Sequence, residues 1–146
     1  MFEAVCKNTI VPLMLRLCLA AVFIFHGWQL VGGEGHQWGS AWANSKNPNP
    51  PPQAAQLAVS WGELVGGIAL ALGFLTRLAA LGIIVIMAGA IATVHWKNGF
   101  DLQKGGYEYN VALITMCLAL VLTGGGMLAV DRLFWRRRVP PGAATP

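Results

Sequence analysis

Apolar residues fall into four long runs along the chain, and short polar segments separate them. Each run has roughly the 20 apolar residues that a helix needs to cross a bilayer. The pattern predicts an all-α protein, an integral membrane four-helix bundle with spans over residues 11–31, 54–75, 78–96 and 109–130. Only Thr76 and Arg77 separate the second run from the third, and one helix through both would be about 64 Å long. Because no bilayer is that thick, we expect a tight reversal near these two residues.

Composition supports a membrane protein of one domain. The chain has 146 residues, of which 55% are hydrophobic and 11% are charged, whereas a soluble domain has about 25% charged residues. These values exclude an ordinary soluble enzyme and a disordered chain. The basic cluster flanks an apolar run, which is typical of membrane anchoring rather than nucleic-acid binding. Cys18 and Cys117 lie inside apolar runs and Cys6 near the N-terminus, so we expect free thiols.

Basic residues predict the orientation of the bundle. Four spans place both termini on one side, which carries most of the basic residues: Lys7, Arg77, Arg132 and residues 136–138. The opposite side carries Lys46, Lys97 and Lys104. The positive-inside rule then places both termini in the cytoplasm. We expect residues 1–135 to form the membrane domain and residues 136–146 a basic, flexible tail beside anionic lipid.

Other positions bear on packing and on the ends of the spans. Arg16 interrupts the first run, so we interpret this run as a retained span rather than a cleaved signal peptide. Gly62 and Gly66 have the G-x-x-x-G spacing that allows close helix packing, here within the bundle. The glycines at 124–126 are expected to loosen or kink the fourth span. The outer segment 34–53 is rich in proline, which disfavours regular helix, and we assign it no role.

Ionisable residues within and beside the runs are the most informative feature. Each costs about 2.5–3.5 kcal/mol to insert into a bilayer. His26 and Glu63 lie within runs, while His95 and Glu108 lie at the ends of runs. The topology predicts that all four lie in the outer half of the bundle. Imidazole and carboxyl groups there can hydrogen-bond the two carbonyls of a quinone and exchange its protons.

Structural interpretations of the same residues stay open. Arg16 can reach towards Glu63 as an intramembrane ion pair, His26 can bond to a neighbouring backbone, and His95 and Glu108 can sit in water. A metal site is a third interpretation, since two His and two Glu match a zinc or iron ligand set in kind. The paired E-x-x-H motifs of di-iron bundles are absent, however, so we predict no metal.

Several motifs, in this order and spacing, resemble the DoxX family of membrane proteins. They are Leu15-Arg16-Leu17, Phe23-Ile24-Phe25-His26-Gly27, Trp61-Gly62-Glu63-Leu64-Val65-Gly66-Gly67, Leu72-Gly73-Phe74-Leu75-Thr76-Arg77-Leu78, Gly105-Gly106-Tyr107-Glu108-Tyr109 and Leu128-Ala129-Val130-Asp131. Ala129 and Val130 depart from the family's pattern. The resemblance covers residues 11–134 and implies a four-helix membrane bundle. It also implies a relation to subunits of quinone-linked oxidoreductases that act in thiol, sulfur or oxidative-stress chemistry.

We therefore expect a bacterial inner-membrane subunit of a quinone-linked oxidoreductase, without a haem, flavin or metal motif. Its catalytic residues would be Glu63, His26, His95 and Glu108. The quinone would contact His26 and Glu63, together with Arg16, Trp61 and Tyr109. The expected partners are the lipid bilayer and a protein of a redox complex, with a homo-oligomer left open. The alternatives are a non-catalytic assembly subunit and a small transporter.

Overall fold

A computed structural model of the chain describes residues 2–35, 37–42 and 49–132. These residues form helices and connecting segments, and no β-strand occurs among them. The four main helices are α2 (Val11–Gly32), α3 (Gln53–Leu72), α4 (Thr76–Ala90) and α5 (Glu108–Thr123). The short α1 (Phe2–Val5) and the π-helical turn η1 (Cys6–Ile10) lead into α2. Single turns of helix occupy η2 (Gln37–Gly39), η3 (Ile91–His95), η4 (Trp96–Asn98) and η5 (Leu102–Lys104).

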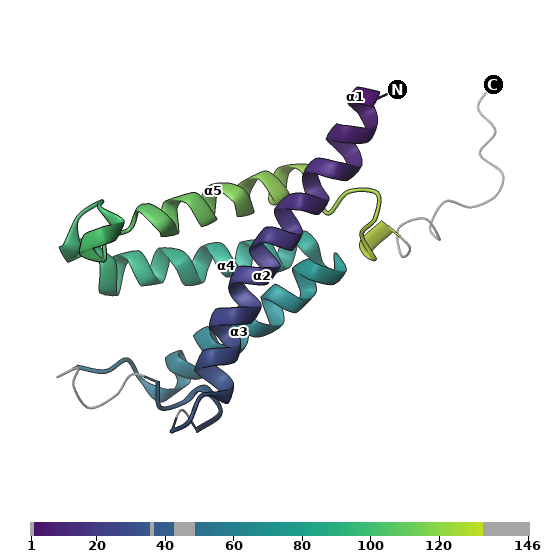
Figure 1. Ribbon diagram of the computed structural model, residues 1–146. Coiled ribbons are helices and arrows are strands. Elements are labelled where there is room, and N and C mark those ends of the chain that lie inside the picture. Colours follow the sequence, from purple (N-terminus) through teal and green to yellow (C-terminus); the bar gives the residue numbers. More distant parts are fainter. Residues whose placement is uncertain (1, 36, 43–48, 133–146) are drawn as a thin grey trace.

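The four main helices form two antiparallel hairpins, α2–α3 and α4–α5 (Figure 1). The hairpins meet at the end where α2 begins, which we call the closed end; it includes the α3–α4 turn at residues 73–75 and the segment 124–132. They diverge towards the other end, which we call the open end; it includes residues 33–35, 37–42, 49–52 and 96–107. The predicted all-α membrane bundle is thus confirmed.

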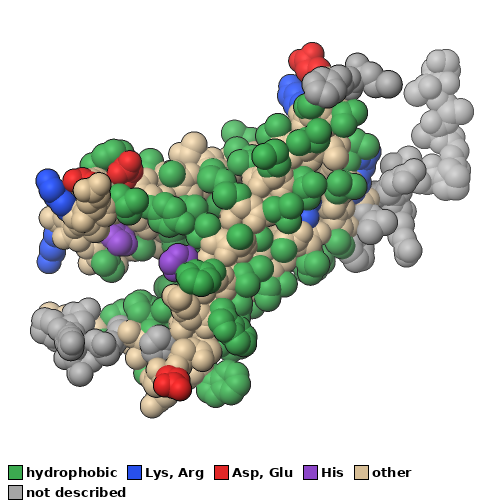
Figure 2. Space-filling model, viewed as in Figure 1, with side chains coloured by type: hydrophobic (Ala, Val, Ile, Leu, Met, Phe, Trp, Pro, Cys, Tyr) green, Lys and Arg blue, Asp and Glu red, His purple; other side chains and the backbone are tan. Residues whose placement is uncertain are grey.

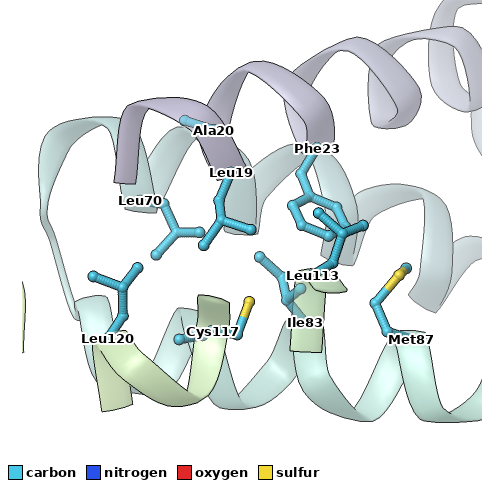
Figure 3. Close-up of a cluster of buried hydrophobic side chains, with 10 residues drawn as sticks. Leu19, Ala20, Phe23, Leu70, Ile83, Met87, Leu113, Cys117 and Leu120 are labelled. Carbon is cyan, nitrogen blue, oxygen red and sulfur yellow. The ribbon is translucent and has the colours of Figure 1, made fainter. Parts of the chain in front are cut away.

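An apolar core fills the space where the hairpins meet. Helices α2, α4 and α5 each supply it with one stripe of side chains at helical spacing, and α3 supplies Leu70 (Figure 3). Its members are Leu19, Ala20, Phe23, Leu70, Ala80, Ile83, Met87, Leu113, Cys117 and Leu120. The core therefore holds the two hairpins at a fixed position relative to each other.

Glycines allow the close approach of α2 and α3. A Cβ atom at Gly27 would lie 2.7 Å from Cα of Leu64, and one at Gly67 would lie 2.8 Å from the backbone N of Ile24. The α3 glycines at 62 and 66 lie against side chains of α4. The prediction that small residues pack within the bundle is confirmed.

Two helix ends differ from the approximate bounds of the predicted spans. The chain reverses at Gly73–Leu75, where Gly73 and Leu75 have positive φ of 69° and 47°, and α4 already begins at Thr76. Helix α5 ends at Thr123 rather than near residue 130, because Gly124 adopts a φ of 77°. The glycines at 124–126 therefore end the fourth helix instead of kinking it.

Three helical stretches are long and apolar enough to cross a membrane: Cys6–Gly32, Gln53–Leu72 and Thr76–Asn98. The apolar α5 is shorter, with 16 residues. Together with their apolar surfaces, these helices identify a multi-pass membrane protein. The expected tail at 136–146 and residues 43–48 of the proline-rich segment lie outside the described residues.

Candidate functional site

Buried polar side chains lie at both ends of the apolar core. Arg16 and Thr76 lie at the closed end, whereas Glu63 and Asn110 continue the interior stripes of α3 and α5 towards the open end. A buried polar group is costly unless it finds a hydrogen-bond partner. The partners of these side chains therefore distinguish structural residues from candidate functional ones.

Arg16 is bonded fully into the closed end. Its side chain is 1% exposed, and Nε and Nη2 donate to the carbonyls of Leu70 and Ala71, each at 2.8 Å. Nη1 donates to the carbonyl of Gly125 at 3.0 Å. The last carbonyls of a helix have no partner within the helix. Arg16 thus caps the C-terminus of α3. Through its bond to Gly125 it also joins α3 to the segment that follows α5.

Asp131 caps the next helix at the same end. Its two carboxylate oxygens accept hydrogen bonds from the backbone N–H groups of Leu75 at 2.6 Å and Thr76 at 2.8 Å. A carboxylate at this position also compensates the partial positive charge of the N-terminus of α4. The closed end is therefore a structural junction of α2, α3, α4 and the segment after α5.

The structure does not bring Arg16 to the open end. Glu63 precedes Leu70 by seven residues on α3, which is about 10 Å at helical rise. No Arg16–Glu63 ion pair forms among the described residues, whose one ion pair joins Lys104 to Asp101. The ion-pair interpretation was wrong, and we leave Arg16 out of the candidate site.

Glu63 faces the interior between the two hairpins. On α3, Gly62 and Gly66 face α4, whereas Leu64 and Gly67 face α2. Glu63 lies between these two directions on the helix circumference, since successive residues are rotated by about 100°. It therefore points to the region where the hairpins begin to diverge.

The carboxyl group of Glu63 has no bonded partner there. Its residue is 7% exposed, and no hydrogen bond or ion pair joins it to any other described residue. Leu70, two turns further along the same stripe, belongs to the apolar core. The carboxyl group of Glu63 thus lies at the edge of the core, and no hydrogen bond or ion pair to a described residue explains its burial.

Asn110 is a second interior polar residue, which the sequence analysis missed. It is 5% exposed, and its Nδ2 donates to the thioether sulfur of Met87 at 3.5 Å, which is a weak acceptor. The available signal was its spacing, because Asn110, Leu113 and Cys117 recur at helical period on one face of α5. Met87 follows Ile86, which lies against Gly62 of α3, so Asn110 lies at about the level of Glu63 along the bundle.

His26 lies at the level of Glu63 on the neighbouring helix. The contact between Gly27 and Leu64 places residue 26 of α2 beside residues 63–65 of α3. The imidazole is exposed and meets the ring of Phe25 edge-on, with ring centres 5.6 Å apart. Figure 2 shows histidine side chains on both sides of a notch between the hairpins.

His95 and Glu108 lie at the loop of the α4–α5 hairpin. Nδ1 of His95 is 2.7 Å from the carbonyl oxygen of Gly105, which can only accept, so Nδ1 carries the proton and Nε2 remains available. The exposed Glu108 accepts a hydrogen bond from the backbone N of Leu102 at 3.2 Å. The four predicted catalytic residues are therefore divided between the two hairpins.

The described residues contain no group of three His, Cys, Asp or Glu side chains suited to a metal ion.

Trp61 and Tyr109 lie at the rim of the open end. The indole N–H of Trp61 donates to the carbonyl of Trp38 at 3.0 Å, and the hydroxyl of Ser60 donates to Gly39 at 3.1 Å. These bonds fasten part of the long connecting segment to α3. Tyr109 is 39% exposed and directly precedes the buried Asn110.

Comparisons with known proteins indicate the family. A model of the DoxX family matches residues 11–96. A Bacillus subtilis protein provisionally named oxidoreductase CatD is 29% identical over 122 residues, which cover 82% of this chain and 83% of that protein. An uncharacterised Haemophilus influenzae protein is 30% identical over 71 residues, which cover 49% of this chain and 47% of that relative. No solved structure matches the chain.

Proposed function

The chain belongs to the DoxX family and is a multi-pass membrane protein, and on this premise we propose that it is a subunit of a quinone-linked oxidoreductase. The name of the Bacillus subtilis relative supports oxidoreductase chemistry in general. The proposal places the protein in a bacterial inner membrane with both termini in the cytoplasm. Its partner would be a protein that carries the electron donor, from thiol, sulfur or oxidative-stress chemistry.

The observation that carries the proposal is the carboxyl group of Glu63, which lies inside the bundle and bonds to none of the residues that the structure describes. Structural carboxylates of this chain have partners, as Asp131 shows with its two bonds to α4. An ionisable residue retained within a membrane span commonly serves a substrate or proton pathway. Glu63 and the Nδ2 group of Asn110 therefore supply an acid–base group and a donor for a membrane-soluble ligand.

These residues fit the head of a quinone. When bound, a quinone supplies an acceptor for two electrons and two protons. The carbonyls of its head would be held by Nδ2 of Asn110 and by the carboxyl group of Glu63, and Trp61 and Tyr109 would line the rim. His26 would exchange protons with Glu63 from the exposed side, because an imidazole ring can both donate and accept a proton. His95, through its available Nε2, and Glu108 would pass protons to the aqueous face.

Co-purification tests the proposal. The full chain is purified in mild detergent, and its extracted lipid is analysed for quinone by mass spectrometry. We expect near-stoichiometric quinone in the wild type and at least a tenfold loss in Glu63→Gln, with unchanged thermal unfolding. Glu34→Gln, an exposed carboxylate after α2, is the matched control and should retain quinone. Equal quinone in Glu63→Gln and the wild type would contradict the proposal.

One observation favours a second function, that of a non-catalytic assembly subunit. On the outer face of α4, Cβ atoms at Gly82 and Gly89 would meet nothing within 4 Å. A shallow apolar groove of about 460 Å³ continues along this helix at Ala88, Ile91, Ala92 and Trp96. Small residues on an exposed span suit contact with another membrane helix. A protein partner that co-purifies at constant ratio, without quinone, would favour this function.

A further inference from the structure

Three basic side chains at the closed end are exposed and have no ion-pair partner among the described residues. They are Lys7, Arg77 and Arg132. Within residues 2–35, 37–42 and 49–132 the one ion pair, between Lys104 and Asp101 at 3.8 Å, lies at the open end. The charges of the closed-end residues are thus not neutralised by direct contacts within the described protein.

Backbone bonds hold these three residues on one rim. Met127 N donates to the carbonyl of Asn8 at 2.9 Å, so the segment after α5 passes directly beside Lys7. Asp131 bonds to the backbone N of Thr76 at 2.8 Å. Arg132 directly follows Asp131 in the chain, and Arg77 directly follows Thr76. The two arginines therefore flank the same junction.

The nearest carboxylate does not neutralise this rim. Both carboxylate oxygens of Asp131 bond to the N-terminus of α4. Part of its negative charge is therefore balanced by the partial positive charge of that helix end. Glu3 lies one turn before Lys7 and offsets one charge. The rim therefore keeps an excess of positive charge, to which the buried Arg16 adds.

Exposed apolar side chains lie next to the basic ones. Leu72, Leu78 and Leu128 are 57%, 63% and 62% exposed. Leu72 and Leu78 belong to spanning helices on either side of the α3–α4 turn. A free phosphate ion would gain nothing from these leucines, whereas the acyl chains of a lipid would cover them. The arrangement thus matches a phosphate group above hydrocarbon.

We propose that the closed end binds the headgroup of an anionic phospholipid. Arg77 and Arg132 bind its phosphate, since a guanidinium group offers paired donors to phosphate oxygens, and Lys7 adds charge. The acyl chains lie along the exposed leucines of α3 and α4. This site is separate from the one at Glu63 and does not depend on quinone binding.

Native mass spectrometry of the full chain tests this proposal. The protein is taken from nanodiscs of phosphatidylcholine that contain a minor fraction of phosphatidylglycerol, and retained lipids are counted. We expect the wild type to retain phosphatidylglycerol preferentially. The double variant Arg77→Gln/Arg132→Gln should lose about tenfold or more of that preference, since each basic residue near a membrane surface contributes about fivefold. The matched control, Lys97→Gln/Lys104→Gln at the open end, should keep it.

Each remaining outcome also decides the question. Equal retention in the Arg double variant and the wild type overturns the proposal, as does an equal loss in the Lys double variant. Displacement of phosphatidylglycerol by millimolar inorganic phosphate would show a free-phosphate site and overturn the lipid assignment. Should the Gln variant fail to fold, Arg77→Lys/Arg132→Lys keeps the charge without the paired donors. The preference of this Lys variant for phosphatidylglycerol should then fall only partly. An unchanged preference would show that paired donors from the two arginines do not bind the phosphate.

Discussion

At the scale of the residue, Arg16 and Glu63 gave the same signal in the sequence, an ionisable side chain inside an apolar run. The structure separates them by their partners: Arg16 bonds to three backbone carbonyls, and Glu63 to none of the described groups. Sequence spacing could not reveal this, because the carbonyls of Leu70 and Ala71 become available only where α3 ends. Asn110 was missed for another reason: it lies inside the predicted span 109–130 but is uncharged, and only ionisable side chains marked candidate positions.

Replacing Arg16 should destabilise the protein. Arg16→Gln cannot serve three carbonyls, and each hydrogen bond from a charged group contributes about 1.5–3 kcal/mol. We expect the free energy of unfolding in detergent to fall by about 2–4 kcal/mol. Arg132→Gln, an exposed arginine at the same end, is the control and should change little. An Arg16→Gln protein as stable as the wild type would show that the cap contributes nothing.

Replacing Asn110 should affect stability and ligand binding in opposite directions. Its amide is buried against a thioether, so Asn110→Leu removes a poorly satisfied polar group. We expect stability that is unchanged or about 1 kcal/mol higher, with several-fold less co-purified quinone. Thermal unfolding and lipid extraction of one preparation measure both quantities. A loss of stability with full quinone retention would assign Asn110 a structural role instead.

At the scale of the element, the long apolar runs located every main helix but not every helix end. The runs continue through Gly73–Leu75 and through residues 124–130, because turns inside a membrane protein are also apolar. What ends the helices is backbone geometry, namely the positive φ at Gly73 and at Gly124. Hydropathy alone does not show where the backbone adopts positive φ.

Glycine contacts give a matched test of helix packing. Gly27→Ala would place a methyl group 2.7 Å from Cα of Leu64, where the backbone of α3 cannot yield cheaply. We expect a loss of about 1–3 kcal/mol, as for other overpacked sites. Gly82→Ala, which meets open space on α4, should be neutral or stabilise by up to about 1 kcal/mol. Thermal unfolding in one detergent compares the two. Equal effects would mean that α2 and α3 do not pack as closely as described.

At the scale of the whole molecule, the sequence predicted the bundle but not the divergence of its hairpins. Topology predicted His26, Glu63, His95 and Glu108 in the outer half of the bundle. It could not show that the α2–α3 and α4–α5 hairpins separate there, which leaves two of these residues on each (Figure 1). That separation depends on where the apolar core stops, at Phe23, Met87 and Leu113. The molecule thus has a bonded junction at one end and an interior polar region at the other.

The shortness of α5 has a consequence for the surrounding bilayer. Its 16 residues span about 24 Å at helical rise, against about 30 Å of hydrocarbon in a typical bilayer. Such hydrophobic mismatch is relieved by local thinning, which draws headgroups and water towards Tyr109 and Asn110. We expect the melting temperature to be higher in nanodiscs of shorter-chain lipids than of longer-chain ones with the same headgroup. The membrane beside α5 would then itself shorten the path that a proton travels to the interior.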